Sequence, residues 1–295
     1  MSALPSGQTT APVPERTGWT GYILMVPGIV WLLAFFVIPF YSLVATSLYD
    51  PNGSTYAGYE MTWAFGNYAD AISKYWGPLL RSLLYGAAAT LICLVLGYVL
   101  AYAIAFKAGR WKNLMLVLVI APFFTSFLVR TLSWKLLLAD DGFIVNALKF
   151  VHLLGPDGRL LATPVAVIAG LVYNFLPFMV LPLFASIGKI DHRLVEAASD
   201  LYASPIRAFF KVTWPLLLPG VVSGTLLTFI PAAGDYINAA LLGSPRQRMV
   251  GNVIQNLFTA ANDYPSAAAL SMILMLIILV MVLLYVRKAG TEELL

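Results

Sequence analysis

Charged residues are scarce in this sequence: they make up 11% of its 295 residues, whereas hydrophobic residues make up 60%. A soluble domain carries about 25% charged residues and about 45–50% apolar ones. The chain therefore has too little charge to cover a surface that faces water. This shortage argues against a soluble enzyme, a disordered protein and, despite a formal net charge of +4, a nucleic-acid binder. The chain is expected to lie in a lipid bilayer and to bind no nucleic acid.

Residues that hold metals or form disulfides are nearly missing. The one cysteine, Cys93, lies in the apolar run LICLVLG and is expected to be a small buried hydrophobic residue. A single cysteine excludes a disulfide framework and a cysteine metal site. The two histidines, His152 and His192, lie outside the apolar runs, which argues against a multi-histidine metal centre. No metal or cofactor is expected.

Catalytic motifs are missing as well. The sequence contains no G-x-x-x-x-G-K-[ST] phosphate-binding loop, so any ATP must be hydrolysed by another chain. It also lacks H-E-x-x-H and G-x-S-x-G, the motifs of common zinc-dependent and serine hydrolases. The chain is therefore not expected to be an enzyme.

Long apolar runs are what the sequence has instead. A membrane-spanning helix needs about 20 largely apolar residues, and six runs qualify: 22–46, 80–106, 113–138, 163–188, 212–236 and 266–286. The third and fourth are interrupted, by APFF, Arg130 and Lys135 and by NFLPF. The runs predict an all-α membrane protein with six transmembrane helices over residues 22–288. Residues 1–21 are expected to form a flexible tail rather than a signal peptide, and residues 289–295 a C-terminal tail.

Basic residues in the connecting segments indicate the orientation, because cytoplasmic loops carry an excess of Lys and Arg. With both termini inside, ten basic residues fall inside and six outside. The inside set is Arg16, Lys107, Arg110, Lys112, Lys189, Arg193, Arg207, Lys211, Arg287 and Lys288, and the outside set is Lys74, Arg81, Lys149, Arg159, Arg246 and Arg248. Both termini are therefore predicted to be cytoplasmic. The outside segments 47–79, 137–162 and 243–265 are expected to form a docking face.

The inside loop 189–211, KIDHRLVEAASDLYASPIRAFFK, is amphipathic. Ser204 followed by Pro205 is typical of a helix N-cap with proline at the first helical position. The loop is predicted to form two short helices that lie under the membrane.

The same loop resembles the conserved cytoplasmic loop of the permease subunits of bacterial ABC importers: EAA, three residues, Gly, nine residues, then Ile-x-Leu-Pro. Glu196, Ala197 and Ala198 supply the EAA, Tyr202 stands at the glycine position, and Val212, Trp214 and Pro215 fall in the last motif. The resemblance implies a helix that sits in a groove of a separate ATPase subunit. It assigns this coupling role to Glu196, Ala197, Ala198, Ser199, Asp200, Tyr202 and Pro205. A tyrosine at the glycine position, Tyr202, is expected to cost about 1 kcal/mol of stability if the turn is left-handed, or to shift the turn towards Ala203.

Longer segments carry the resemblance over most of the chain. VPGIVWLLAFFVIPFYSLVATSL, PFFTSFLVRTLSW, FIPAAGDYINAALLG and VGNVIQNLF followed by DYPSAAALS are similar to segments of the spermidine/putrescine permease subfamily. The resemblance implies a type I importer permease of the MetI-like fold in the bacterial inner membrane, carrying polyamines. It also implies three partners: a second permease subunit, a dimer of ATP-hydrolysing subunits and an extracytoplasmic substrate-binding protein.

Charged groups inside spans are costly and often functional. Asp235 is expected in the outer part of the fifth run, after Pro231 and Gly234 break the helix. Two roles stay open for it: a carboxylate that lines the pathway for a cationic substrate, or a structural helix cap or ion pair with Arg130. Arg130 and Lys135 either snorkel to the interface or bind anions, which would favour a cargo other than a polyamine.

Polar and aromatic residues in the spans complete the candidate pathway. Trp134, Tyr173, Asn174, Tyr236 and Asn238 are predicted to form a cation site with Asp235 if they cluster beside it, because aromatic faces attract alkylammonium groups. Taken singly, each is expected to be a packing residue or an interfacial anchor. Gly220 and Gly224 form a small-xxx-small pattern that predicts close helix packing.

Two rival functions stay open at this point. An ABC permease for another small solute, such as an opine, an amino-acid derivative or an anion, would place Arg130 and Lys135 in the pathway. An ATP-independent secondary transporter would need inverted repeats or paired intramembrane carboxylates, and neither is evident in the sequence.

Overall fold

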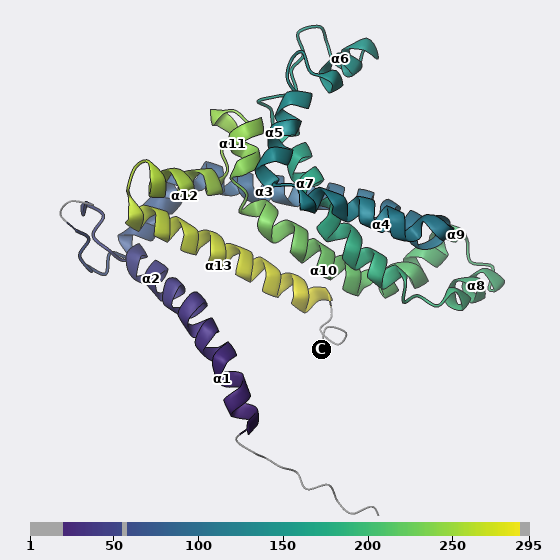
Figure 1. Ribbon diagram of the computed structural model, residues 1–295, viewed down its shortest axis with the longest axis horizontal. Helices are drawn as coiled ribbons and strands as arrows, with labels where there is room; N and C mark the ends of the chain where they lie inside the picture. Colours follow the sequence, from purple (N-terminus) through teal and green to yellow (C-terminus); the bar gives the residue numbers. More distant parts are fainter. Residues whose placement is uncertain (1–19, 55–57, 290–295) are drawn as a thin grey trace, which may run out of the picture. The chain divides into compact units, whose positions relative to one another are not determined.

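The computed structural model describes residues 20–54 and 58–289, and the predicted tails 1–21 and 289–295 lie almost wholly outside these ranges. The chain divides into two units, Met1–Ala45 and Thr46–Leu295 (Figure 1). Nearly all described residues are helical. Apart from the isolated bridges Tyr49–Met61 and Ser54–Gly58, the described part has no β-structure.

The first unit is one apolar helix with a local change of winding. It comprises α1 (Thr20–Leu32), a π-helical turn (Leu33–Val37) and α2 (Ile38–Ser47), the end of which crosses into the second unit. Its residues are hydrophobic all round rather than on one stripe, as expected of a helix surrounded by lipid. Pro27 lies inside α1 without ending it. The first predicted span is confirmed.

The second unit holds the remaining helices, with bounds α3 (Gly66–Tyr102), α4 (Lys112–Ile120), α5 (Phe127–Leu137), α6 (Phe143–Phe150), α7 (Pro164–Ile187), α8 (His192–Asp200), α9 (Pro205–Ala208), α10 (Trp214–Ala233), α11 (Ile237–Leu242), α12 (Val250–Thr259) and α13 (Tyr264–Ala289). Over the described residues, five helical segments are long and apolar enough to span a membrane, and a sixth span exists if the bent pair α4–α5 is counted as one.

Three predicted boundaries need correction. The second span begins at Gly66 rather than residue 80, so much of the expected loop 47–79 is helical, with a kink at Tyr75 three residues before Pro78. The third, 113–138, is two helices bent by 96° around Thr125 and Ser126. Pro122 lies in the 3-10 turn before the bend, where its missing N–H and fixed φ favour a break in the helix. The fifth ends at Ala233, short of residue 236.

The fourth span, in contrast, is continuous. α7 runs through Pro177 and Pro182, and the Thr163 hydroxyl caps its start by accepting from the Ala166 N–H at 3.3 Å. The freed carbonyls of the prolines are tolerated because neighbouring helices pack on both sides.

Close contacts at glycine hold α3, α7 and α10 together. A Cβ atom at Gly224 would lie 2.7 Å from the Met179 sulfur, and one at Gly220 would lie 2.4 Å from the Ser186 hydroxyl, so both glycines let α10 approach α7 closely. This confirms the packing role predicted for the small-xxx-small pattern. Gly86 on α3 makes the equivalent approach to Ala233.

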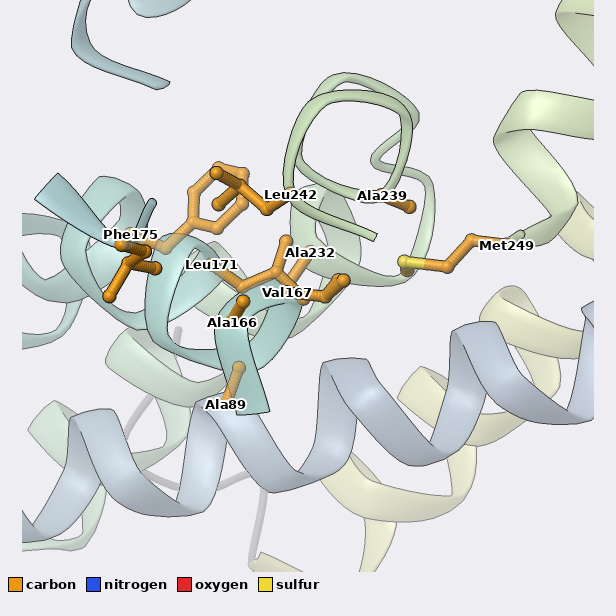
Figure 2. Close-up of a cluster of buried hydrophobic side chains, with 10 residues drawn as sticks. Ala89, Ala166, Val167, Leu171, Phe175, Ala232, Ala239, Leu242 and Met249 are labelled. Atoms are coloured by element: carbon orange, nitrogen blue, oxygen red, sulfur yellow. The ribbon is translucent and has the colours of Figure 1, made fainter. Parts of the chain in front are cut away.

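One buried cluster joins α3 and α7 to α11. Ala89 of α3, Leu171 and Phe175 of α7, and Leu242 of α11 converge with Met249, which precedes α12 (Figure 2). Cys93 is fully buried in a second cluster with Met179 and Leu183, as predicted for a small hydrophobic residue.

The connection from α5 to α7 carries an exposed ion pair. The Arg159 Nε donates to the Asp140 carboxylate at 2.8 Å, and this hydrogen bond holds the pKa of the Asp140 carboxyl below its usual value. Since both side chains are largely exposed, the pair is expected to add little stability.

Candidate functional site

Two regions bring the predicted residues together, and the first is the loop 189–211, called the EAA segment below. It forms two short helices, α8 and α9, as predicted. The Ser204 hydroxyl accepts from the Arg207 N–H at 3.4 Å, and Pro205 is the first residue of α9. The sequence signals for this helix start are therefore confirmed.

The turn between α8 and α9 is left-handed at the position where the motif expects glycine. Tyr202 has a φ of +55°, a conformation that costs a residue with a Cβ atom roughly 1 kcal/mol. The turn does not shift to Ala203. The Tyr202 side chain is 96% exposed, so no packing within the described chain compensates for this cost.

Apolar side chains on the EAA segment face solvent. Leu201 is 81% exposed and Ile206 73% exposed, beside Tyr202. Ala197 and Asp200 are exposed as well, whereas the side chains of Glu196 and Ser199 lie outside the described residues. Contiguous exposed apolar surface of this kind marks a contact for another protein or a membrane.

The EAA segment is joined to the following span by continuous helix. After α9 the helix continues through a π-helical turn, Phe209–Thr213, directly into α10. The Phe209 ring packs edge-on against Tyr98 of α3 at 5.6 Å and against Trp214 at 6.0 Å. The segment is therefore continuous with α10 and in ring contact with α3.

The second region is a set of buried polar side chains from three helices, called the buried polar cluster below: Thr131 of α5, Asn174 of α7, Asn238 of α11 and Asp235 before α11. The Asn174 amide donates to the Asn238 side-chain oxygen at 3.1 Å and to the Thr131 hydroxyl at 3.3 Å. Asn238 and Thr131 are fully buried. The Asn174 Oδ1 and Asn238 Nδ2 atoms are buried without a hydrogen-bond partner in the described residues.

Asp235 lies in the connection between α10 and α11 rather than within a span. Its carboxylate accepts from the Asn238 N–H at 2.8 Å and so caps α11, while the side chain is only 7% exposed. The backbone of Gly251 packs closely on Gly234 and Asp235, leaving no room for a Cβ atom at residue 251. The helix-cap role that the sequence left open is therefore observed.

Arg130 neither snorkels to the interface nor pairs with Asp235. It is 7% exposed, with its guanidinium 5.4 Å from the Phe123 ring and 5.6 Å from the Phe127 ring. The bend between α4 and α5 brings Phe123 back over α5, which is why Arg130 is covered. In the described part of the chain its Nε and Nη1 atoms have no partner, whereas Lys135 is exposed.

Of the aromatic residues predicted to cluster beside Asp235, Trp134 and Tyr173 pack against each other, whereas no ring contact among the described residues joins either of them to Tyr236. The Trp134 and Tyr173 rings are 5.4 Å apart and line an apolar groove of about 500 Å³ with Ile92 and Leu176. The Tyr236 side chain is 41% exposed, and its carbonyl accepts from the Asn252 amide. The link between α7 and Asp235 is polar instead: the Asn174 amide donates to the Asn238 side chain, and the Asn238 N–H donates to Asp235.

Thr131 is the member of the cluster that sequence reasoning missed. Its hydroxyl also donates to the Phe127 carbonyl one turn earlier at 3.1 Å. A hydroxyl on the same helical face as Phe127 and Trp134 is the signal that could have found it. Among the described residues, no group of three or more His, Cys, Asp or Glu side chains is arranged to hold a metal ion.

A set of apolar spans with one break, an exposed helical loop and a buried polar cluster are features of a membrane transport component, and sequence comparison defines the class. The chain belongs to the family of binding-protein-dependent transport system inner membrane components, whose family model matches residues 93–288.

Particular relatives are spermidine/putrescine transport system permease proteins. That of Salmonella typhi is 37% identical over 268 residues, covering 90% of this chain and 93% of the relative. That of Escherichia coli is 36% identical over 260 residues, covering 88% and 94%. Among solved structures, a bacterial ABC transporter involved in the import of the acidic polysaccharide alginate matches with a TM-score of 0.72 at 18% identity, covering 93% of this chain and 96% of that one. This likeness confirms the ABC importer permease fold.

Proposed function

We propose that this chain is a permease subunit of an ATP-driven importer for polyamines in a bacterial inner membrane. The observation that carries the proposal is the identity of 36–37% to spermidine/putrescine permeases over about nine-tenths of both chains. The aligned region includes both the spans and the loops, so the similarity extends over nearly the whole permease chain rather than one motif.

The partners follow from this function. A second permease subunit completes the pathway, a dimer of ATP-binding cassette subunits supplies ATP hydrolysis, and an extracytoplasmic binding protein delivers the solute. A transporter of the same fold is described in complex with a substrate-bound periplasmic protein, which supports the last of these. The spanning domain covers residues 22–288, and the tails 1–21 and 289–295 are both cytoplasmic.

Coupling is assigned to the EAA segment. Ala197 and Ala198 present a small helix face that a partner can approach closely, and Leu201, Tyr202 and Ile206 add exposed apolar area beside it. The residues proposed to contact the ATPase are Glu196, Ala197, Ala198, Ser199, Asp200, Tyr202 and Pro205. The continuous connection of this segment to α10 provides the route by which ATPase movement reaches the spans.

The pathway is assigned to the region around the buried polar cluster. A polyamine that leaves water needs a compensating negative charge, because an unpaired charge in a low-dielectric environment costs several kcal/mol. Asp235 provides one carboxylate with Tyr236 next to it in the chain, and the paired rings of Trp134 and Tyr173 lie on α5 and α7, the helices that carry Thr131 and Asn174. Asn174 joins the two sides by its hydrogen bond to Asn238. A single carboxylate favours passage over tight binding.

A second candidate cargo is an anion, and one observation favours it. The Arg130 guanidinium is buried, and two of its nitrogens have no partner in the described residues. A carboxylate on the solute would satisfy them if the pathway opens beside α5.

The experiment is uptake of labelled spermidine into proteoliposomes that contain the full complex and its binding protein. Asp235→Asn keeps an oxygen that caps α11 and removes the charge, so assembly is expected to survive while uptake falls about tenfold or more, the effect of losing roughly 1.4 kcal/mol or more of charge compensation. Asp263→Asn is the matched control, because Asp263 caps α13 through the Ser266 N–H at 3.1 Å and has no proposed pathway role. Normal spermidine uptake by assembled Asp235→Asn complex contradicts the cation site, and uptake of an anionic solute instead favours the second cargo.

A further inference from the structure

An apolar groove on the membrane-spanning part of the chain has no role in the transport function described above. It lies between α3, α10 and α13, which run side by side (Figure 1), and encloses about 500 Å³. Leu91 and Leu94 of α3, Trp214, Leu218 and Phe229 of α10, and Tyr285 of α13 line it. On each helix the lining residues fall at spacings of one, three or four, which place them on one face that forms the groove.

Basic residues stand close in sequence to the aromatic residues at one end of the groove, which itself has no charged lining residue. Trp214 begins α10, and Tyr285 lies near the end of α13, so the two aromatic side chains mark the same end of an antiparallel pair. Lys211 lies three residues before Trp214, and Arg287 and Lys288 lie just after Tyr285. All three basic side chains are exposed, and no ion pair to any of them occurs within residues 20–54 and 58–289.

We propose that this groove binds one anionic phospholipid. An acyl chain lies between α3, α10 and α13, and the phosphate lies near Lys211, Arg287 and Lys288. Tryptophan and tyrosine favour the level of the headgroups at a membrane interface, and basic side chains there attract anionic lipids. Only the choice of leaflet, the cytoplasmic one, rests on the topology proposed above.

Charge favours a lipid over a helix of the second permease as the occupant. Cytoplasmic ends of spanning helices carry an excess of Lys and Arg, so such a helix would place like charges against Lys211, Arg287 and Lys288. An anionic phospholipid has the matching arrangement, with a negative group at the end of an apolar chain. The Thr90 hydroxyl in the groove donates to the Gly86 carbonyl at 2.7 Å, so it does not need a polar partner from the occupant.

The test is native mass spectrometry of the purified full chain in mild detergent, with phosphatidylglycerol or phosphatidylcholine of identical acyl chains. Phosphatidylglycerol is expected to bind about tenfold tighter or more. Arg287→Gln with Lys288→Gln is expected to weaken its binding roughly 10- to 30-fold, from the contribution of two basic residues near an anionic membrane surface. Lys107→Gln with Arg110→Gln removes the same charge outside the groove and is expected to leave binding unchanged.

The apolar part of the site has its own pair of variants. Ala87→Phe places a ring in the groove and is expected to weaken the binding of both lipids, whereas Leu96→Phe, on an exposed face of α3, is expected not to. Equal binding of the two lipids, or an unchanged affinity in the Arg287 and Lys288 variant, overturns the proposal. A photoreactive residue at Leu218 that crosslinks to a protein subunit rather than to lipid in native membranes overturns it too. Because lipid retention is measured without transport, failure here leaves the permease assignment untouched.

Discussion

The EAA segment and the buried polar cluster differ in the solvent exposure of the side chains proposed to function. In the EAA segment the prominent side chains are exposed, with Leu201 at 81% and Tyr202 at 96%. In the cluster Asn174 is 1% exposed and Asn238 is fully buried, and hydrogen bonds join α5, α7 and α11. Exposed apolar side chains add no packing to the fold of the chain and mark a contact surface. Buried polar groups stabilise the fold only where they have hydrogen-bond partners.

The two regions should therefore respond differently to substitution. Changes in the EAA segment are expected to alter partner binding while the chain stays folded. Changes to the hydrogen-bonded side chains Thr131, Asn174 and Asn238 of the cluster are expected to reduce stability first, and transport only through the altered geometry of α5, α7 and α11, whereas Asp235 is tested separately through its charge. The following predictions test this separation, beginning with the largest effect.

Ala197→Trp is expected to reduce ATPase binding and spermidine uptake about tenfold or more. The indole adds bulk to a small, exposed helix face, and excess bulk in a close contact costs about 1–3 kcal/mol. ATPase binding is measured by pull-down with purified permease, and folding by thermal unfolding, which is expected to be unchanged.

Ala147→Trp is the matched control for this substitution. Ala147 is an exposed alanine of α6, in a segment predicted to lie on the other side of the membrane. Full ATPase binding by Ala197→Trp, or an equal loss in both variants, would show that the EAA segment does not contact the ATPase.

Asn238→Ala is expected to lower the free energy of unfolding by about 1–3 kcal/mol, the cost of leaving a buried hydrogen-bonding group without its partner. The Asn174 amide would lose its bond to the Asn238 oxygen. The measurement is thermal unfolding of the purified chain in detergent, with Asn256→Ala on the exposed face of α12 as control. Equal melting temperatures for the two variants would mean that the buried polar cluster adds no stability.

The sequence predicted most of the fold because its strongest signals are local. Long apolar runs located the spans, and Ser204-Pro205 located the start of α9, since both depend on neighbouring residues alone. The boundaries failed where tertiary packing decides. Gly66 begins α3 well before the apolar run, and the third run breaks with a 96° bend after Pro122, whereas α7 continues through Pro177 and Pro182.

The candidate site was less predictable, because its contacts join residues far apart in the sequence. The cap that Asp235 forms on α11 is local and was one of its two predicted roles, whereas the Asn174 amide bonds Thr131 and Asn238, which lie 43 and 64 residues away in the sequence. Arg130 looked suited to snorkelling until Phe123 and Phe127 were seen to cover it. A single sequence does not specify such cross-helix neighbours.

Tyr202→Gly has the smallest expected effect, and it distinguishes the role of the Tyr202 backbone from that of its side chain. Tyr202 has a φ of +55°, which glycine adopts without a Cβ penalty. Relief of strain is expected to raise the free energy of unfolding by up to about 1 kcal/mol, less the greater freedom of glycine in the unfolded chain. Thermal unfolding of the purified chain measures this.

Tyr202→Ala completes the comparison, because it removes the ring and keeps the strained backbone. It is expected to be no more stable than the natural chain. If the ring contacts the ATPase, both variants lose ATPase binding equally, since the ring is 96% exposed and free to meet a partner. Equal stability of the glycine and alanine variants would mean that the left-handed turn carries no cost. A loss of binding confined to Tyr202→Gly would instead show that a rigid turn, rather than the tyrosine ring, presents α8 to the ATPase.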